Sequence, residues 1–296
     1  MSETLPEAFL AGLRQLGLQS VYPAGPRQLG PQSVYPAGLG LQSVGAGEGL
    51  SGEGTFMVAR MQETPTVIQQ FLRYRRELLE WNTRFNLTAI TDPEEVLLRH
   101  FLDSLSLLLV YNVQRARLLD IGSGAGFPGL ALKIARPDWQ VTLLEATNKK
   151  VLFLRHMIEI LQLKGLEAVH GRAEELGHNE QYRASFDVVT ARAVASLPTL
   201  LEYAAPFCRV GGQVVLFKKG DLAEELVQRK HAAHQLGLVL KADVAVSLPG
   251  LEDGRRLLVW EQRELCPAQF PRAGAVMARR PLGEKRPSTQ GMAGEG

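Results

Sequence analysis

The stretch LLDIGSGAGFPGLAL, residues 118–132, joins a short apolar run, a glycine-rich loop and the start of an apolar helix. The run reaches Asp120, and glycines then occupy every second position from 122 to 126. Glycine allows tight turns and lets a ligand approach the backbone closely, because it has no Cβ to stand in the way. We therefore expect a buried strand, a ligand-binding loop and a helix in succession.

A carboxylate stands at the end of the next predicted strand. VTLLE, residues 141–145, is mainly apolar up to Glu145, which lies 25 positions after Asp120. In α/β sheets, a carboxylate at the end of the neighbouring strand holds the hydroxyl groups of a ribose. The glycine loop alone would be weak evidence, but the loop and Glu145 together predict a cofactor that contains adenosine.

The glycine spacing favours one class of adenosine cofactor. Residues 124–129, GAGFPG, match the dinucleotide pattern GxGxxG, which would suggest NAD. That match begins two residues late, however, and from the strand end the pattern is D-x-G-x-G-x-G, typical of S-adenosylmethionine-dependent methyltransferases. This cofactor has no pyrophosphate and needs no phosphate-binding helix N-terminus, and Pro128 is compatible with a first helical turn. We therefore favour a methyltransferase over a dehydrogenase.

Strands and helices alternate from Arg117 onward. This alternation predicts an α/β fold with a mostly parallel sheet and helices on both faces. The last two strands are expected to pair antiparallel, which suits a Rossmann-like, class I S-adenosylmethionine-dependent methyltransferase. The expected strands are RLLDIG, VTLLE, EAVHG, FDVVTA, QVVLFKK, LVLKADVAV and RRLLVWEQR, and the expected helices are residues 130–135, 149–161, 197–207 and 221–236.

An N-terminal helical extension is predicted before this alternation. Apolar residues recur at helical spacing after Pro65, and this helix is expected to end near Trp81 and Asn82. Asp92 then provides an N-cap, with Pro93 at the first helical position. The helix that follows, VLLRHFLDSLSLLL, is apolar around most of its circumference. We therefore expect it to have neighbours on two sides.

A repeat lies still closer to the N-terminus. RQLGLQSVYPAG (residues 14–25) and RQLGPQSVYPAG (residues 27–38) differ at one position, and the fragment LGLQSV follows. Units this few and this short cannot bury a shared core, and proline and glycine interrupt regular structure. We expect a linker after a short helix at residues 5–16. The predicted organisation is a short helix and flexible Gly/Pro-rich linker (1–64), a helical cap (65–113), a Rossmann-like methyltransferase domain (114–265) and a basic C-terminal tail (266–296).

Composition narrows the class of protein. The net charge of +2 excludes gross polybasic character and confines any nucleic-acid surface to a local patch. Cys208 and Cys266 lie in no metal-binding motif, and His231 and His234 are expected to be solvated, so we expect no metal site. No signal peptide is evident, and the apolar stretch at residues 104–113 is about half of what spans a bilayer. These features predict a soluble cytoplasmic protein.

Five motifs resemble, in the same order, those of the RsmG (GidB) family, whose members methylate one guanine at N7 in 16S ribosomal RNA. The resemblance covers residues 66–282 and includes the closing segment FPRAGAVMARRPL. It implies an S-adenosylmethionine-dependent enzyme whose partner is 16S ribosomal RNA, the small subunit or an assembly intermediate. The motifs are EWNTRFNLTAITDPEEVLLRHFLDSLSLL, LLDIGSGAGFPGLALKI, LLEATNKKVLFL, HGRAEEL and VVTARAVASL.

The resemblance also implies cofactor contacts. Gly122 and Phe127 match loop positions of the family, and Arg192 matches an arginine of its cofactor site. The matched segments follow predicted strand ends, where ligands bind in α/β sheets. Phe127 has an alternative as a core residue, and Glu174 as an acidic residue of a helix N-terminus. The ribose segment is matched by Glu145, Ala146 and Thr147, and the adenine segment by Ala173 and Glu174.

The implied reaction needs positioning of the base more than proton transfer. Guanine N7 carries an exposed lone pair, so we expect no general base, and no His/Asp or Cys/His pair stands out in the sequence. The guanine must be unpaired or splayed out to be reached. The candidates for positioning the substrate are Asn86, His100, Lys218 and Lys219.

These candidates and their neighbours also have purely structural interpretations. Asn86 is equally compatible with a turn residue, and His100 with a core histidine. Arg99 and Asp103 are four residues apart, and we slightly favour an ion pair within a helix over contacts with RNA.

Other basic residues also have structural interpretations. Lys149 and Lys150 are expected to form a solvated face. Contacts with phosphate and a solvated end are equally compatible with the tail residues Arg272, Arg279, Arg280, Lys285 and Arg286.

The fold alone leaves three functions open, namely an RNA methyltransferase, a small-molecule methyltransferase and a non-catalytic RNA binder. The intact glycine loop, Glu145 and Arg192 argue against the non-catalytic RNA binder.

Overall fold

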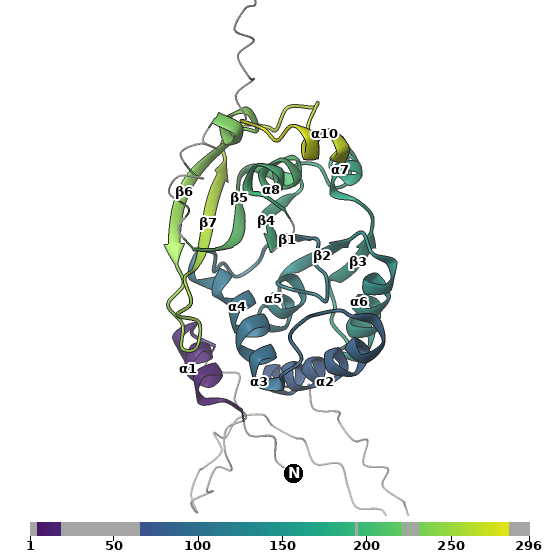
Figure 1. Cartoon of the computed structure of the whole chain (residues 1–296), viewed down its shortest axis with the longest axis vertical. Helices are drawn as coiled ribbons and strands as arrows, with labels where there is room; N and C mark the ends of the chain where they lie inside the picture. Colours follow the sequence, from purple (N-terminus) through teal and green to yellow (C-terminus); the bar gives the residue numbers. More distant parts are fainter. Residues whose placement is uncertain are drawn as a thin grey trace, which may run out of the picture.

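The computed structural model describes residues 5–18, 66–192, 195–220, 222, 226 and 231–283. Strands in these residues form one seven-stranded sheet in the order β3-β2-β1-β4-β5-β7-β6 (Figure 1). β1 to β5 pair in parallel, whereas β7 is antiparallel to β5 and to β6. The strands are β1 (Arg117–Ile121), β2 (Gln140–Glu145), β3 (Leu166–His170), β4 (Phe186–Arg192), β5 (Cys208–Lys219), β6 (Leu238–Ala245) and β7 (Arg255–Gln262).

This topology confirms the predicted class I methyltransferase fold. The chain moves outward from β1 to β3 and then returns to place β4 on the other side of β1. Open α/β sheets bind ligands at such a switch point, beyond the carboxyl ends of the strands. The predicted antiparallel pair is also confirmed, as β6 and β7 at the edge of the sheet.

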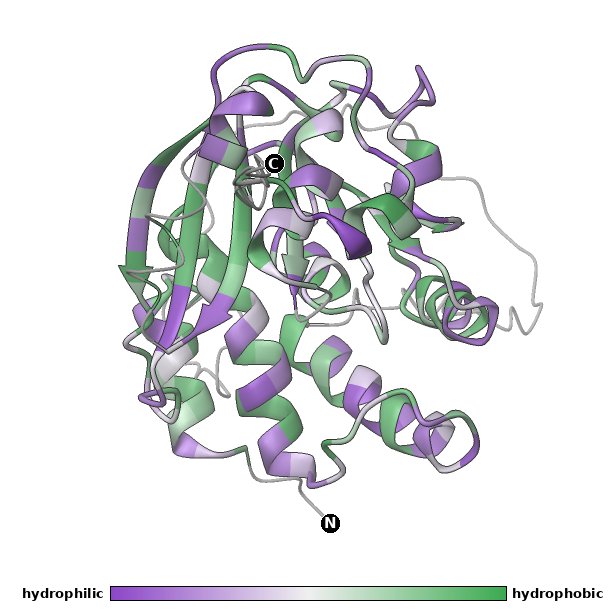
Figure 2. Ribbon diagram, turned by 45° about the horizontal axis from the view of Figure 1, so that its top comes forward, coloured by the Kyte–Doolittle hydropathy of each residue, from purple (hydrophilic) through white to green (hydrophobic). Residues whose placement is uncertain are grey.

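Both faces of the central strands are buried, as expected for parallel strands. Leu118 of β1 and Val188 of β4 belong to one hydrophobic cluster, and Leu119 and Val189 belong to the other. Because successive side chains point to opposite faces, each apolar strand supplies both clusters. Figure 2 shows the result, with mainly hydrophobic strands between helices that are hydrophilic on one side.

Helices cover the two faces of the sheet. α5 (Gly129–Ala135) and α6 (Asn148–Ile160) contribute to the cluster that contains Leu118. α7 (Ala173–Leu176) and α8 (Leu197–Ala204), which is followed by a short 3-10 turn, contribute to the other cluster. The predicted helices at residues 130–135, 149–161 and 197–207 are thus confirmed to within one or two residues at most ends.

Helix α2 (Val67–Phe85) begins at a capping box, in which Thr66 and Gln69 exchange hydrogen bonds. The predicted end near Trp81 and Asn82 is wrong, because the helix continues to Phe85 and ends at Asn86. The Asn82 side chain forms the turn after the helix by hydrogen bonding the backbone of Thr88 at 2.9 and 3.0 Å. Asn86 itself has φ of 49°, a left-handed conformation that asparagine tolerates better than most residues.

The next helical segment begins as predicted, with the Asp92 carboxylate accepting hydrogen bonds from the amides of Glu94 and Glu95. Its helical type was not predicted. α3 (Pro93–Glu95) leads into a π-helical stretch, η2 (Val96–Leu102), then into α4 (Asp103–Leu105) and the 3-10 helix η3 (Ser106–Leu109). The expected packing on two sides is confirmed, because η2 contacts α1 and α4 contacts α5.

Helix α1 (Glu7–Gln15) matches the predicted short helix, and it packs against the cap. Phe9 and Leu13 are fully buried, and Gly12 faces Leu102 so closely that an added Cβ would lie 2.6 Å from its methyl groups. Leu16 and Leu18 extend this buried surface past the end of the helix. The first helix is therefore part of the same hydrophobic core as α2.

The end of the described chain also has structure. Helix α10 (Gly274–Arg279) lies beside α7 (Figure 1), and Cys208 and Cys266 are buried and free. No helix in the described residues is long and apolar enough to cross a membrane. Residues 19–44 of the repeat, half of the helix expected at residues 221–236 and the tail after residue 283 lie outside the described residues, whereas residues 231–235 are helical, as predicted. The four-part division of the chain stays a prediction.

Candidate active site

The glycine loop turns directly above the end of β1. Gly122, Gly124 and Gly126 have φ of 67°, 60° and 102°, values that favour glycine. A Cβ at Gly126 would lie 2.5 Å from the hydroxyl oxygen of Tyr74. The amides of Gly122 and Ser123 donate to the carbonyl oxygen of Leu144, which ties the loop to β2. The glycines thus serve both the turn and the close approach of α2.

Glu145 anchors this loop from the end of β2. One carboxylate oxygen accepts from the amide of Gly124 and the other from the amide of Thr147, both at 2.8 Å. Glu145 is 6% exposed, so these hydrogen bonds satisfy a nearly buried charge. The carboxylate therefore fixes the loop and the start of α6 relative to each other.

Asp120 lies beneath the loop and is fully buried. Its Oδ2 atom accepts from the amide of Gly129 at 2.8 Å, whereas Oδ1 has no hydrogen-bond partner within the described part of the chain. Burial raises the pKa of Asp120 to about 7, although the Gly129 amide opposes the shift. Gly129 must lack a side chain, because its Cβ would lie 2.8 Å from this carboxylate.

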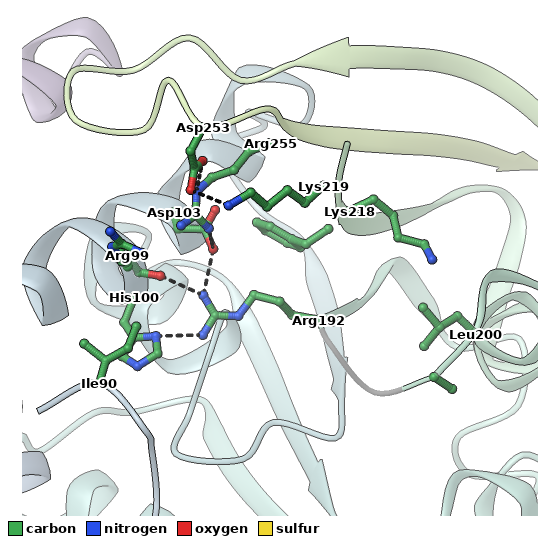
Figure 3. A pocket seen from close by; sticks show the side chains of 12 residues that line it. Ile90, Arg99, His100, Asp103, Arg192, Leu200, Lys218, Lys219, Asp253 and Arg255 are labelled. Atoms are coloured by element: carbon green, nitrogen blue, oxygen red, sulfur yellow. Dashed lines mark hydrogen bonds and ion pairs between the residues drawn. The ribbon is translucent and has the colours of Figure 1, made fainter. Parts of the chain in front are cut away.

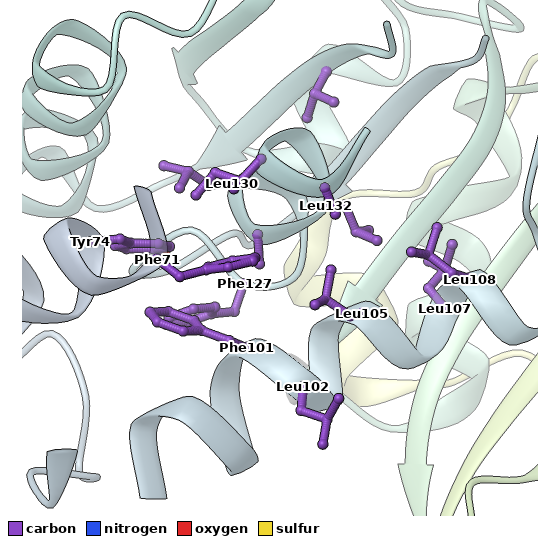
Figure 4. Packing of buried hydrophobic residues seen from close by; sticks show 14 of the residues in the cluster. Phe71, Tyr74, Phe101, Leu102, Leu105, Leu107, Leu108, Phe127, Leu130 and Leu132 are labelled. Carbon is purple, nitrogen blue, oxygen red and sulfur yellow. The ribbon is translucent and has the colours of Figure 1, made fainter. Parts of the chain in front are cut away.

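Phe127 is both a core residue and part of the site. Its ring stacks between Tyr74 and His100, with centroid distances of 5.3 and 4.5 Å. It also lies 5.6 Å from Phe101, and Figure 4 shows Phe127 beside Tyr74 and Phe101. The Tyr74 hydroxyl in turn donates to the carbonyl oxygen of Ala125. Aromatic stacking of this kind fixes the position of each ring. The loop is therefore held against the cap by a column of aromatic side chains.

Arg192 extends from the end of β4 toward the cap (Figure 3). Its guanidinium donates to Asp103 at 2.8 Å, to the carbonyl oxygen of Arg99 at 3.3 Å and to Nδ1 of His100 at 3.2 Å. Since Nδ1 accepts, Nε2 of His100 carries the proton and donates to the Thr88 hydroxyl at 2.7 Å. Burial, and next the charge of Arg192, lowers the pKa of His100 to about 3, so this imidazole is neutral.

A chain of ion pairs continues from Asp103, which is 3% exposed. Arg255 lies 3.0 Å from the same carboxylate oxygen that binds Arg192. Its Nε atom lies 2.9 Å from Asp253, in an orientation that makes an ion pair without a hydrogen bond. Lys219 pairs with the other oxygen of Asp253 at 2.9 Å. Asp103 thus joins strands β4 and β7 to the cap.

The predicted ion pair between Arg99 and Asp103 is wrong. Arg99 instead lies 3.3 Å from Glu95, four residues before it. The Asp103 carboxylate is instead paired with Arg192 and Arg255, which approach it from β4 and β7. Helical spacing shows which residues could pair within a helix, but not which charged residues of other elements take their place.

Three cavities follow the carboxyl edge of the sheet. The first, called the loop cavity, has a volume of about 370 Å³. It shares His100 and Arg192 with the second, the basic cavity, of about 480 Å³, and Gly122 and Ala146 with the third, the small cavity, of about 130 Å³. The loop cavity is lined by Leu87, Thr88, His100, Gly122, Ser123, Gly124, Ala125, Phe127, Glu145, Ala146, Lys150 and Arg192.

The basic cavity has a cationic wall and an apolar wall. Its charged lining residues are five cations and two carboxylates, and its apolar lining includes Ile90, Leu200 and Phe217. Lys218 and Lys219 are both in this lining, and their role in positioning the substrate stays a prediction. The charged residues are Arg99, Arg192, Lys218, Lys219 and Arg255 with Asp103 and Asp253.

The small cavity contains the remaining predicted cofactor segment. Ala173 and Glu174 line it from α7, and Tyr203 lines it from α8. Thr147 lines none of the three cavities, and its backbone amide donates a hydrogen bond to Glu145. Asn86 also lines none of them, which agrees with its interpretation as a turn residue.

Sequence reasoning missed several residues of these cavities. Arg255 and Asp253 were not singled out, although two adjacent arginines at the start of a strand are an unusual signal. Tyr203 had no signal in the sequence, because only the fold brings α8 to α7. Lys150 was expected in a solvated face, but it is half-buried and lines the loop cavity, whereas Lys149 is exposed.

One tail residue expected to contact phosphate or solvent is instead paired within the protein. The guanidinium of Arg272 binds both carboxylate oxygens of the fully buried Glu202, each at 2.7 Å. Arg279 and Arg280 are exposed, as expected. Among the residues whose placement is described, no group of His, Cys, Asp and Glu side chains is arranged to bind a metal ion.

Comparisons with known proteins agree on one family. A family model for rRNA small subunit methyltransferase G (GidB) matches residues 67–254. The ribosomal RNA small subunit methyltransferase G of Roseiflexus sp. (strain RS-1) is 49% identical over 215 residues, which cover 73% of this chain and 92% of that protein. The protein of the same name from Dehalococcoides mccartyi (strain CBDB1) is 47% identical over 72% of this chain and 91% of its own.

Solved structures show a weaker similarity. A branched-chain polyamine synthase from Thermus thermophilus has a TM-score of 0.47 and 15% identity, over 66% of this chain and 64% of its own. Similarity at this level leaves both ligand and activity open.

Proposed function

Because the chain belongs to the rRNA small subunit methyltransferase G family, we propose that it transfers the methyl group of S-adenosylmethionine to N7 of one guanine in 16S ribosomal RNA. The observation that carries this proposal is the junction of the loop cavity and the basic cavity at His100 and Arg192. A cofactor on the glycine loop and a nucleotide against the cations would meet there, as direct transfer between them requires.

The loop cavity and the small cavity fit an adenosine cofactor. They meet at Gly122 and Ala146, and the Glu145 carboxylate lines the loop cavity. When bound, the cofactor supplies a methyl group on a positively charged sulfur. The residues that would contact it are Gly122, Phe127, Glu145, Ala146, Ala173, Glu174 and Arg192, and Thr147 would contribute by holding Glu145 through its amide.

Glu145 can bind a ribose without releasing the loop. Each of its oxygens accepts one backbone hydrogen bond, from Gly124 or from Thr147. A carboxylate has about four acceptor positions, so lone pairs remain for two hydroxyl donors. This arrangement supports the ribose role, because the loop would already be in place before the cofactor binds.

His100 is suited to positioning rather than to proton transfer. Its Nδ1 atom is occupied by Arg192, and its lowered pKa makes the imidazole a weak base. Guanine N7 needs no base, because its lone pair is free on the major-groove edge. His100 and Arg192 would thus orient the acceptor, and in-line placement would supply the rate enhancement.

The basic cavity supports a nucleotide as the acceptor. Its apolar wall of Ile90, Leu200 and Phe217 can cover the face of a base. Arg99 and Lys219, whose side chains are 49% and 61% exposed, can reach phosphates at the rim. The guanine would have to be unpaired to enter, and a small ribosomal subunit or an assembly intermediate in the cytoplasm would present it.

The test uses S-adenosylmethionine with a labelled methyl group and small-subunit RNA that lacks this modification. After transfer, the RNA is digested and its nucleosides are identified by mass. We expect label in 7-methylguanosine at one site, and reduced binding of cofactor by Glu145→Ala and by Arg192→Ala. Bound cofactor with no label in free RNA, in subunits or in assembly intermediates would contradict the proposed substrate. Unchanged cofactor affinity in both variants would contradict the proposed site.

A further inference from the structure

The C-terminal segment, defined as residues 266–282, packs on the two helices that line the small cavity. Cys266, Phe270 and Leu282 belong to the hydrophobic cluster that also contains Ala173 of α7 and Leu200 of α8. Figure 1 shows α10 of this segment next to α7. The segment is therefore an integral part of the fold at this position.

Arg183 holds the first half of the segment through backbone carbonyl groups. Its guanidinium donates to the carbonyl oxygens of Cys266, Pro267 and Phe270 at 2.8 to 3.0 Å. It also donates to the carbonyl oxygen of Gly177, directly after α7, at 2.7 Å. One side chain thus fixes the segment relative to the end of α7, because a guanidinium has five donors in a rigid plane.

Glu202 holds the second half. Its carboxylate is fully buried and accepts three hydrogen bonds from Arg272. Two come from the guanidinium and the third, at 2.9 Å, from the backbone amide of Arg272. The hydrogen bond to Glu202 raises the pKa of Arg272 further. Glu202 precedes Tyr203, so this clamp lies directly beside the small cavity.

Gly274 is the point at which the segment approaches Glu174, a residue that lines the small cavity. A Cβ at this position would lie 2.8 Å from Oε1 of Glu174 and 4.0 Å from the hydroxyl oxygen of Tyr203, two residues of the cavity lining. The side chain of Glu174 is 14% exposed and lies 3.5 Å from Arg172. Because Gly274 has no side chain, the Glu174 carboxylate can occupy its present position, and a side chain at residue 274 would push it away.

We infer that the C-terminal segment supports the adenine pocket from behind its lining, and that Gly274 is a positioning residue for the Glu174 carboxylate. This inference rests on the proposed function, because it takes the small cavity as the adenine site. The 6-amino group of adenine donates hydrogen bonds, and a carboxylate held at the correct distance accepts one. A hypoxanthine base, which has an oxygen at that position, would be repelled by the same carboxylate. The segment thereby sets specificity for adenine.

The variant Gly274→Ala tests this with little risk to folding. The backbone of Gly274 lies outside the left-handed region, and it occupies the first position of α10, where alanine is favourable. The added methyl group meets the end of a flexible side chain rather than the backbone. We expect it to displace the carboxylate of Glu174 and to leave the fold intact.

Binding is measured by calorimetry with S-adenosylhomocysteine and with S-inosylhomocysteine, which differ only in the base. We expect Gly274→Ala to weaken binding of the adenine ligand about ten-fold and to leave the hypoxanthine ligand unchanged or tighter. Glu174→Gln should have a similar effect, and the double variant should add little to it. The control is Glu175→Gln, which removes an exposed carboxylate from the same short helix and should change neither affinity.

The outcomes separate this inference from the proposed function. If the unchanged protein binds neither ligand, the cofactor proposal itself is wrong. If it binds S-adenosylhomocysteine and Gly274→Ala alters neither affinity, or lowers both equally, the positioning role of Gly274 is wrong while the cofactor proposal remains. A loss confined to the adenine ligand supports the inference, because general damage to the fold would affect both.

Discussion

The two sides of the loop cavity are built by different kinds of contact. On the loop side, the Glu145 carboxylate meets the backbone amides of Gly124 and Thr147, which belong to neighbouring turns of the same sheet edge. On the cap side, Asp103 binds Arg192 of β4 and Arg255 of β7 at 2.8 and 3.0 Å. One side is therefore shaped by local backbone, and the other by charges from three distant segments.

This difference predicts different consequences of mutation. Removing one member of a buried ion pair leaves an uncompensated charge, which is strongly destabilising. Removing the Glu145 carboxylate loses its hydrogen bonds to backbone amides, but Gly124 and Thr147 are partly exposed, so water can take its place. We therefore expect changes on the cap side to reduce stability first, and changes on the loop side to reduce cofactor binding first.

The largest effect is expected for Asp103→Asn. This change leaves the guanidinium groups of Arg192 and Arg255, which are 15% and 17% exposed, without their shared carboxylate. We expect the free energy of unfolding to fall by about 3 kcal/mol, measured by urea denaturation. The control is Glu95→Gln, which breaks a half-exposed pair with Arg99 and should cost less than about 1 kcal/mol. Equal effects of the two changes would contradict the comparison.

Glu145→Gln should affect binding more than stability. Glutamine can accept from only one of the two amides, of Gly124 and Thr147, and its amino group then faces the other. We expect the dissociation constant of S-adenosylhomocysteine to rise about 100-fold, measured by calorimetry. Glu159→Gln, an exposed residue of α6, is the matched control. A large loss of stability with unchanged affinity would reverse the assignment of the two sides.

The loop side could be predicted from the sequence because its chemistry is local. Glycine spacing, a strand end and a carboxylate 25 positions later are sufficient to place Gly122 and Glu145 at one edge of a parallel sheet. Glu174 was implied by the family resemblance, and its position just after β3 is consistent with the same rule. Alternating strands and helices also determine the layers of the fold, because each apolar strand must be covered on both faces.

The cap side could not be predicted, because its pairs join residues that no local pattern relates. Asp103 was assigned to Arg99 by helical spacing, but its carboxylate pairs with Arg192 and Arg255, and Arg99 pairs with Glu95. Arg255 lies more than 150 positions after its carboxylate partner. Arg272 presents the same difficulty in the tail, since its buried partner Glu202 is 70 positions away. Ion pairs between distant elements become evident only from the fold.

Two buried groups should give opposite pH dependences of stability. Burial raises the pKa of Asp120 to about 7, so the contribution of Asp120 to the free energy of unfolding is greatest at low pH. This contribution is lost as the pH rises from about 4 to about 7. The pKa of His100 is lowered to about 3, so its contribution is present above about 6.5 and is lost as pH falls toward 3. In the wild-type protein, these two contributions to the free energy of unfolding change with pH in opposite directions between pH 4 and pH 6.5.

Single variants should therefore separate the pH dependence of stability due to Asp120 from that due to His100. Relative to the unchanged protein, Asp120→Asn should gain stability as pH rises from 4.5 to 7.5, and His100→Gln should lose it over the same range. We expect each relative change to be on the order of 2 kcal/mol, measured as urea denaturation at several pH values. Stability curves that stay parallel to that of the unchanged protein would show that neither group titrates as its burial implies.

A smaller effect is expected at the exposed end of the C-terminal segment. Arg279 and Arg280 are exposed, unlike Arg272, and can contact RNA phosphates. Replacing either with alanine should weaken RNA binding about three-fold and reduce the salt dependence by about one phosphate contact. Binding of S-adenosylhomocysteine should not change. Lys241→Ala, an exposed charge on β6, is the control, and an equal loss of RNA affinity there would exclude a specific contact.

The smallest effect is expected from shortening the connection between α1 and α2. Removing residues 19–44 shortens the stretch between Leu18 and Thr66 by more than half. For a flexible connection, the entropy of closure changes by only about 0.6 kcal/mol for each factor of two in length. We expect methyl transfer within about two-fold of the unchanged protein.

The boundary of this deletion matters, because a deletion that begins at Gln15 should behave differently. It would remove Leu16 and Leu18, which are 6% and 4% exposed, and the hydrogen bond from Gln15 to the carbonyl oxygen of Ser247. Burying a leucine contributes about 2 kcal/mol, so the longer deletion should lower the free energy of unfolding by several times the effect of the shorter one. If the shorter deletion alone abolished methyl transfer while stability was kept, the repeat would take part in the function rather than only join two helices.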